Sequence, residues 1–245
     1  MGMMIDVARI DNTTNNLANV DSPGFKKDNQ AFTSYLKKEI SRMEAENTER
    51  KEKYIGAFET AVVLDEVYSD FQQGSFVETG NNTDFYINGD SFFHVSGTDE
   101  KDFYTKSGAF TINSEGLLTD FSGNYILNNA GETITFDKDS VIDENGNIYV
   151  DNVISGRIGI YAFDNEKQLV KKGNNLFEYT GNQNGINEDF ESKVIQGGFE
   201  KSNVNSIREM VNLIDAQRHF EICQRVITTE DELLNAAVNR VGTIR

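Results

Sequence analysis

The sequence is poor in several residue types that would point to a particular class of protein. Its 245 residues include one proline, one cysteine, two histidines and no tryptophan. A single cysteine excludes a disulfide within the chain, and it usually indicates a reducing compartment. No apolar run approaches the ~18 residues of a membrane-spanning helix, and residues 1–16 lack the basic and apolar regions of a secretory signal. Composition alone therefore predicts a cytosolic protein without membrane insertion.

Basic residues are also scarce, with 23 Lys and Arg against 40 Asp and Glu, which gives a formal net charge of -17. Such a chain repels nucleic-acid phosphates and anionic lipid surfaces, so neither is an expected partner. Hydrophobic residues make up 38% of the chain and aromatic residues 11%. That content is sufficient for the buried core of one sizeable domain or two small ones.

Residues that could carry catalysis or bind a metal are few. His94 and His219 lie in different segments, and neither has the spacing of a zinc site. Cys223 belongs to an apolar helical pattern, where it is expected to pack as a small hydrophobe. Asp143, Asn145 and Asn147 occupy the first three ligand positions of a calcium loop, but its required Gly and Glu are missing. A type I′ hairpin is the better interpretation there, and we expect no enzyme, cofactor or metal.

The first segment, residues 1–40, is predicted to be helical at its start. Met3, Val7, Ile10, Thr14 and Leu17 follow a 4-3-4-3 spacing that places them on one side of a helix. The helix must end before Pro23, and Pro23-Gly24 is predicted to form the centre of a type II turn. The charged residues 31–54 fit an exposed helix and a loose connector equally well, and residues 41–70 are assigned to a connector.

The middle of the chain, residues 71–199, is predicted to be a β domain of antiparallel hairpins. Short runs alternate aromatic or branched residues with polar ones, and turn signals such as Asn88-Gly89-Asp90 and Ser122-Gly123-Asn124 recur between them. Spacing of this kind is typical of a sandwich, a barrel or a meander. The predicted fold class is therefore mixed but mainly β, with helices at both ends.

The last segment, residues 200–245, is predicted to be one long helix with a coiled-coil seam. Its apolar residues recur at 3.5-residue spacing, which also fits an ordinary helix packed on a domain core. We expect it to pair with the N-terminal segment as a stalk that uses neighbouring copies to bury its apolar face. The seam consists of Ala216, Phe220, Cys223, Ile227, Leu234, Ala237 and Val241, with Glu230 as its polar member.

Four stretches resemble the bacterial flagellar rod and hook proteins. "NNLANVDSPGFKKD" (residues 15–28) is similar to that family's N-terminal signature. "FQQGSFVETGNNTDFYINGDSFF" and "YTKSGAFTINSEGLLTDFSGNYIL" resemble its central segments, although Asp90-Ser91 replaces the usual Gly-x. "GGFEKSNVNSIREMVNLIDAQRHFEICQRVITTEDELLNAAV" is close to its C-terminal signature. The stretches occur in the expected order and together span nearly the whole chain.

The resemblance implies a non-catalytic subunit of the basal-body rod, assembled with its own copies and with other rod and hook proteins. It implies export through the flagellar apparatus without a cleaved signal peptide and a final place in the periplasm, which revises the cytosolic prediction. It also implies a further apolar helical turn ahead of the position of Met1. The predicted assembly motif consists of Asn15, Asn16, Leu17, Ala18, Asn19, Pro23, Gly24 and Phe25.

The asparagines of that motif suit a crowded interface between subunits, because amides satisfy buried partners without burying a charge. The alternative is that they end a weak helix near solvent. The proximal-rod type is favoured over the distal type on "VVLDEVYSDFQQG" and the compact central domain. Two other functions stay open. One is a binding module for peptidoglycan or ring proteins, which exposed Phe85, Tyr86, Phe92 and Phe93 would mark, although we expect these residues to form the β core. The other is a hydrolase with two close carboxylates.

Overall fold

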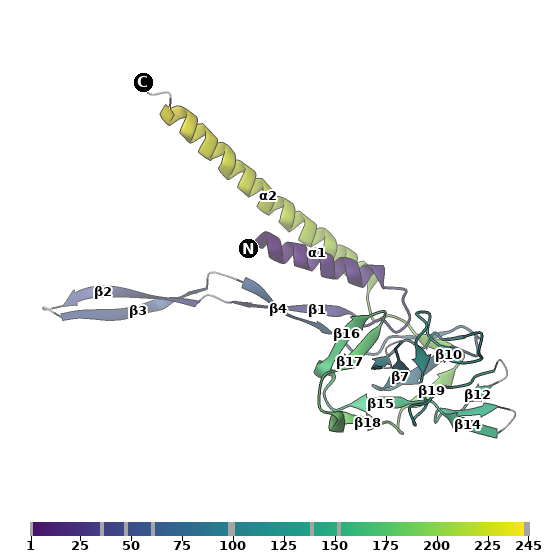
Figure 1. Cartoon of the computed structure of the whole chain (residues 1–245). Coiled ribbons are helices and arrows are strands. Elements are labelled where there is room, and N and C mark those ends of the chain that lie inside the picture. Colours follow the sequence, from purple (N-terminus) through teal and green to yellow (C-terminus); the bar gives the residue numbers. More distant parts are fainter. Residues whose placement is uncertain are drawn as a thin grey trace. The chain divides into compact units, whose positions relative to one another are not determined.

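The computed structural model describes residues 2–34, 37–46, 49–59, 62–97, 101–137, 140–150 and 153–242 (Figure 1). The chain divides into two compact units. The terminal unit comprises Met1–Leu17, Asp28–Tyr68 and Ser206–Arg245, and the central unit comprises Ala18–Lys27 and Ser69–Asn205. The structure is mainly β, with one helix near each end of the chain. Neither helix, within the described residues, is both long and apolar enough to cross a lipid bilayer.

The terminal unit contains both helices, α1 (Gly2–Ala18) and α2 (Ser206–Gly242). It also contains two pairs of strands. Strand β1 (Asp28–Ser34) pairs with β4 (Val62–Ser69), and β2 (Lys37–Glu46) pairs with β3 (Glu49–Glu59). Helix α1 ends before the proline, as predicted, and α2 is the single long helix expected from the seam.

The described residues between 31 and 54 form neither of the two structures that the sequence left open for this stretch. They lie in β1, β2 and the first half of β3, and the β2–β3 pair is an antiparallel hairpin with a bulge at Ile40/Ser41. Its register sets two pairs of opposite charge across from each other, Lys37 with Glu59 and Glu44 with Lys51, and two pairs of like charge, Arg42 with Lys53 and Glu46 with Glu49. Opposite charges across a strand pair favour a hairpin and like charges disfavour it, so these four pairs do not account for the hairpin. The charge pattern alone therefore could not predict it.

The central unit is built from short strands whose pairings, within the described residues, are all antiparallel. The largest sheet has the order β16-β17-β8-β7-β11-β10-β9, and β15 joins it by pairing with both β7 and β18. The strands are β5 (Phe76–Glu78), β6 (Phe85–Asn88), β7 (Phe92–Ser96), β8 (Asp102–Thr105), β9 (Thr111–Ile112), β10 (Leu118–Thr119), β11 (Tyr125–Ile126), β12 (Val141–Ile142), β13 (Asn147–Val150), β14 (Val153–Arg157), β15 (Ile160–Phe163), β16 (Leu169–Gly173), β17 (Leu176–Tyr179), β18 (Ile186–Glu188), β19 (Lys193–Gln196) and β20 (Gly198–Glu200). Two 3₁₀ turns, Glu166–Gln168 and Gln183–Gly185, complete the unit.

Strand β7 is the centre of this unit. It pairs with β8 along one edge, and β11 and β15 share its other edge. Its residues alternate between two buried clusters: Phe93 and Val95 belong to the larger one, and Phe92 belongs to a smaller aromatic one. In the smaller cluster the rings of Tyr104 and Phe163 meet edge to face, with centroids 4.7 Å apart. The core of the central unit therefore lies on both faces of β7.

Four loops of the central unit have the same hydrogen-bonding pattern. In each, the side-chain oxygen of the first residue accepts hydrogen bonds from the backbone N–H groups two and four residues later, and a glycine with positive φ occupies the fourth position. The loops are residues 113–117, 120–124, 128–132 and 143–147.

The prediction of a type I′ hairpin at residues 143–147 was wrong. A type I′ turn needs two consecutive residues with positive φ, but Gly146 is the only one in that loop. The loop is a type I turn followed by a glycine bulge. The Asp143 carbonyl accepts from the Gly146 N–H, and the Asp143 side chain accepts from the N–H groups of Asn145 and Asn147. A two-residue turn with positive φ at both positions does occur at Asn174-Asn175, between β16 and β17.

Candidate functional site: the terminal helices and the signature turn

The aromatic residues that would have marked a binding surface are part of the core. Phe85, Phe92 and Phe93 are completely buried, and Tyr86 is nearly so. His94 is buried as well, stacked on Tyr104 with its Nε2 3.0 Å from Asp102 Oδ1. Burial lowers the pKa of His94, against the opposing effect of Asp102. The site residues must therefore be sought in the helices and in the turn that follows α1.

Asparagine side chains hold α1 to strand β1 within the terminal unit. Asn16 is completely buried, and its amide makes a reciprocal pair with the backbone of Asp28: its Nδ2 donates to the carbonyl at 2.9 Å and its Oδ1 accepts from the N–H at 2.9 Å. Asn12 donates to the same carbonyl. Gln30, in β1, donates to the carbonyl of Ala8. An amide suits this place because it donates and accepts at once without a charge.

The other predicted motif residues of this segment differ in burial. Asn15 and Ala18 are exposed, and Leu17 and Asn19 are half-buried. Asn19 belongs to the central unit, where its carbonyl accepts a hydrogen bond from the Ser22 N–H and its Oδ1 accepts from the Ser22 hydroxyl. The role of Asn15 and Asn19 between subunits stays a prediction. Asn16 has partners within its own chain, which the sequence did not show.

The apolar stripe predicted on α1 is not the side that this chain buries. The buried residues of the helix are Asp6, Thr13 and Asn16, all of them polar. Of the predicted stripe, Val7 and Thr14 are exposed, and the remaining members are only half-buried. Within a single chain, α1 therefore packs through its polar side and leaves much of its apolar side accessible. The hydrogen bonds of Asn16 supply the physical reason for this orientation.

The turn at Pro23-Gly24 has the predicted form. Gly24 has a φ of +63°, and the Phe25 N–H donates to the Ser22 carbonyl at 3.3 Å, as the closing bond of the turn requires. A Cβ on Gly24 would overlap the backbone of Lys106 and Ser107, so a glycine is needed for space as well as for conformation. The sequence signature thus marks a place where two backbone segments meet.

The residue after the turn pair, Phe25, is fixed within the central unit. It is buried, and Lys171 Nζ lies 3.9 Å from its ring centroid. The same lysine donates to the Lys26 carbonyl, and Asn175 Nδ2 donates to the Pro23 carbonyl. Strand β16 and the β16–β17 turn therefore hold the turn at Pro23-Gly24, called the signature turn below, through these contacts.

A buried ion pair joins the two signatures and was missed from the sequence. Lys26 is completely buried, and its Nζ lies 2.7 Å from Glu200 Oε1. It also donates to the carbonyls of Phe71 and Gln72, and Glu200 accepts from the Gly74 N–H. A buried charge pair needs such additional hydrogen bonds to offset desolvation. The only sequence signal was a lysine directly after Phe25 and a glutamate in "GGFE", 174 residues apart.

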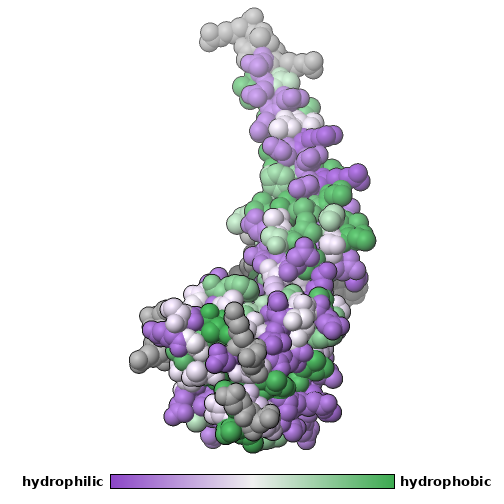
Figure 2. All heavy atoms as spheres, turned by 90° about the vertical axis from the view of Figure 1, so that its right-hand side faces the viewer, coloured by the Kyte–Doolittle hydropathy of each residue, from purple (hydrophilic) through white to green (hydrophobic). Residues whose placement is uncertain are grey.

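The predicted seam of α2 is covered over only part of its length. Ala216 is buried, and Phe220 and Cys223 are half-buried. Beyond them, Ile227 is 48% exposed, Leu234 is 64% exposed and Ala237 is exposed. The side chain of Val241 lies outside the described residues. Figure 2 shows hydrophobic side chains of α2 lying open among hydrophilic ones. The neighbouring stripe, which includes Ile222, Val226 and Leu233, is exposed too.

Comparison with known proteins agrees with these features. Residues 195–240 match the family model described as flagellar basal body rod FlgEFG protein C-terminal, and residues 86–150 match the D1 domain of flagellar hook protein FlgE/F/G. The chain is 31% identical to the flagellar basal-body rod protein FlgF of Caulobacter vibrioides, with 96% of this chain and 92% of that protein aligned. It is 31% identical to the rod protein FlgG of Bacillus subtilis over 97% of this chain and 95% of that protein. The rod protein FlgG of Borreliella burgdorferi is 30% identical over 97% and 95%.

Proposed function

Because this chain belongs to the family of flagellar basal-body rod proteins, we propose that its two helices pair as a coiled coil whose uncovered end is completed by neighbouring subunits. The chain is a structural subunit of the bacterial flagellar rod and not an enzyme. The observation that carries the proposal is the change along the α2 seam, which is covered as far as Cys223 and open from Ile227 onward.

Helix lengths explain where that change occurs. With 17 residues, α1 is about 25 Å long, and with 37 residues α2 is about 55 Å long, at a rise of about 1.5 Å per residue. A partner of less than half the length can cover only part of the seam. In Figure 1, α1 runs beside the first half of α2. The remaining apolar positions lose water only when other helices pack on them, and this burial drives assembly.

The central unit serves as the outer part of each subunit in this proposal. Its core is already closed within one chain, although Phe121, Val153 and Phe190 are exposed on its surface. The partners are further copies of this chain and other rod and hook proteins. We also propose that the flagellar export apparatus carries the chain out of the cytoplasm without a cleaved signal peptide, and that the rod lies in the periplasm.

A charge placed in the open seam tests the assembly. Leu234→Asp should prevent incorporation into basal bodies, because the carboxylate would be buried between subunits without a partner. Asn235→Asp adds the same charge at the next position, outside the seam, and should be incorporated normally. Quantitative mass spectrometry of purified basal bodies from strains with each variant provides the measurement. Normal incorporation of Leu234→Asp would show that this seam is not an interface.

The same measurement on the unaltered chain tests the proposed position along the rod. The proximal-rod type predicts few copies, beside a more abundant rod relative, whereas the distal type predicts that this chain is the most abundant rod component. Similar identities to FlgF and FlgG proteins fit both types. A binding module for peptidoglycan is less favoured, because the aromatic residues proposed for it are buried in the core.

A further inference from the structure

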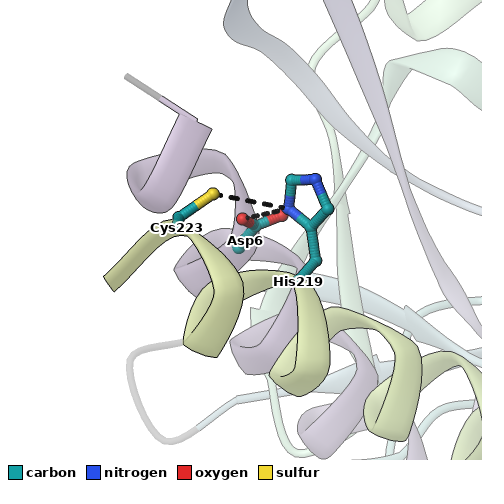
Figure 3. Close-up of side chains that lie close together, drawn as sticks. All are labelled: Asp6, His219 and Cys223. Carbon is teal, nitrogen blue, oxygen red and sulfur yellow. Dashed lines mark hydrogen bonds and ion pairs between the residues drawn. The ribbon is translucent and has the colours of Figure 1, made fainter. Parts of the chain in front are cut away.

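Three side chains with different metal-ligating atoms meet where α1 lies against α2 (Figure 3). Asp6 is on α1, and His219 and Cys223 are one turn apart on α2. His219 Nδ1 donates a hydrogen bond to Asp6 Oδ2 at 2.7 Å and lies 3.9 Å from Cys223 Sγ. One ligating atom from each residue lies within 4.8 Å of the other two.

We propose that Asp6, His219 and Cys223 form a zinc-binding site that ties α1 to α2. The site rests on the pairing of α1 with α2 proposed above. Carboxylate oxygen, imidazole nitrogen and thiolate sulfur are the three protein ligand types of zinc. A tetrahedral ion has one further position, which water fills in the isolated chain.

The three ligand atoms are close enough to hold the ion after side-chain shifts. With bonds of about 2.0 Å to nitrogen and oxygen and about 2.3 Å to sulfur, tetrahedral ligand atoms lie roughly 3.3–3.5 Å apart. The oxygen and nitrogen would therefore move apart by about half an ångström. The sulfur would approach the nitrogen by a similar amount and the oxygen by up to about 1.3 Å. Rotation of the partly exposed His219 and Cys223 side chains can supply these shifts.

The proposed ligands differ in burial, so the site is closed at Asp6 and open to solvent at His219. The Asp6 side chain is only 3% exposed, whereas that of His219 is 62% exposed. A buried carboxylate with one hydrogen bond gains from a cation, and the open side of the site lets a hydrated ion enter. On binding, the thiol loses its proton to solvent, the proton on His219 Nδ1 is exchanged through solvent to Nε2, and the sulfur–zinc and nitrogen–zinc bonds form. The ion replaces the His219–Asp6 hydrogen bond with bonds from one metal to both helices.

Cobalt binding to the purified full-length chain tests the proposal, because Co²⁺ takes zinc sites and reports its ligands by absorption. We expect one Co²⁺ per chain, a thiolate-to-cobalt charge-transfer band and displacement of cobalt by Zn²⁺. Cys223→Ser should abolish the band, and Asp6→Asn and His219→Gln should each weaken binding at least tenfold. Asp11→Asn, an exposed carboxylate on the same helix, should leave binding unchanged.

Several results would overturn the proposal. They are the lack of saturable binding, one cobalt per two chains, and an affinity that Asp6→Asn leaves unchanged. A second measurement uses the unaltered chain and so does not depend on variants that could misfold. Zn²⁺ should slow the alkylation of Cys223 by iodoacetamide at least tenfold. Hydrogen exchange of α1 in metal-free protein reports the helix pairing separately. Protected α1 amides without cobalt binding would reject the metal site and leave the pairing intact.

Discussion

The central and terminal units differ in what they do with their apolar side chains. In the central unit, residues such as Phe93, Leu118 and Ile160 are buried in a closed core. In the terminal unit, Ile227, Leu233 and Leu234 lie on the surface of α2. The central unit therefore has a closed core within one chain, with Phe121, Val153 and Phe190 exposed at separate points of the sequence. The terminal unit instead exposes apolar side chains in a regular row along one helix, which other chains can cover. A rod subunit needs both a closed core and an accessible apolar surface, because it must fold before assembly and still bind its neighbours.

Large-to-small substitutions should show the largest difference between the two units. Phe93→Ala removes a completely buried ring from the centre of β7 and should lower the free energy of unfolding of the central unit by about 4 kcal/mol. Leu234→Ala removes a side chain that is mostly exposed in the single chain. It should change the free energy of unfolding of the terminal unit by less than about 0.5 kcal/mol. Urea unfolding of both purified variants measures the difference. Equal losses would mean that the seam is already buried in one chain.

Gly24 tests whether the signature turn belongs to the closed unit. Gly24→Ala should cost about 3 kcal/mol, because its positive φ is strained for alanine and its Cβ would overlap the backbone of the 106–107 segment. Gly116→Ala has the same backbone strain but open space around its Cβ, and should cost about 1 kcal/mol. Thermal unfolding of the two variants separates the overlap from the strain. Similar losses would show that the segments do not meet as described.

Lys106 should give the stability of the central unit a distinctive pH dependence. Burial and the neighbouring Lys26 lower the pKa of Lys106 to about 8, with partial compensation by Glu200, Asp90 and Glu166. Between this value and the ordinary 10.5 of the unfolded chain, the unfolded state binds more protons, so stability rises with pH.

From pH 7 to pH 9.5, the expected rise from Lys106 is about 2 kcal/mol. Lys106→Met should remove this rise in urea titrations at the two pH values. The window ends there because burial raises the pKa of Tyr104 to about 12, which lowers stability above pH 10. A rise that persists in Lys106→Met would have to come from another group.

The parts of this structure that were predictable from sequence are those set by neighbouring residues. Pro23 fixes one φ angle and Gly24 accepts a positive one, so the turn follows from two adjacent residues. The long α2 follows from a repeated apolar spacing without proline. The turn at 143–147 was assigned the wrong type, because Asn145-Gly146 looks like a central pair when the side chain of Asp143 is not considered.

The features that were missed depend on residues far apart in the chain. Lys26 and Glu200 are 174 residues apart, and Asp6 and His219 are 213 apart, so no local pattern connects them. No local pattern indicated the proposed metal site either, because Asp6 lies on a different helix from His219 and Cys223. The buried side of α1 was also predicted incorrectly. The partner of Asn16 is the backbone of Asp28, and a backbone group has no signature in the sequence.

Asn16 offers the smallest effect and the finest test of how the two units differ. Asn16→Ala removes both hydrogen bonds to Asp28 and leaves its backbone groups without this partner, which should cost about 1–2 kcal/mol. That loss should appear as faster hydrogen exchange at the Asp28 amide and in α1, with unchanged unfolding of the central unit. Thr14→Ala, on the exposed side of the same helix, should leave exchange unchanged. If Asn16→Ala instead destabilised the central unit equally, the two units would unfold as one, and the helices could not rearrange independently during assembly.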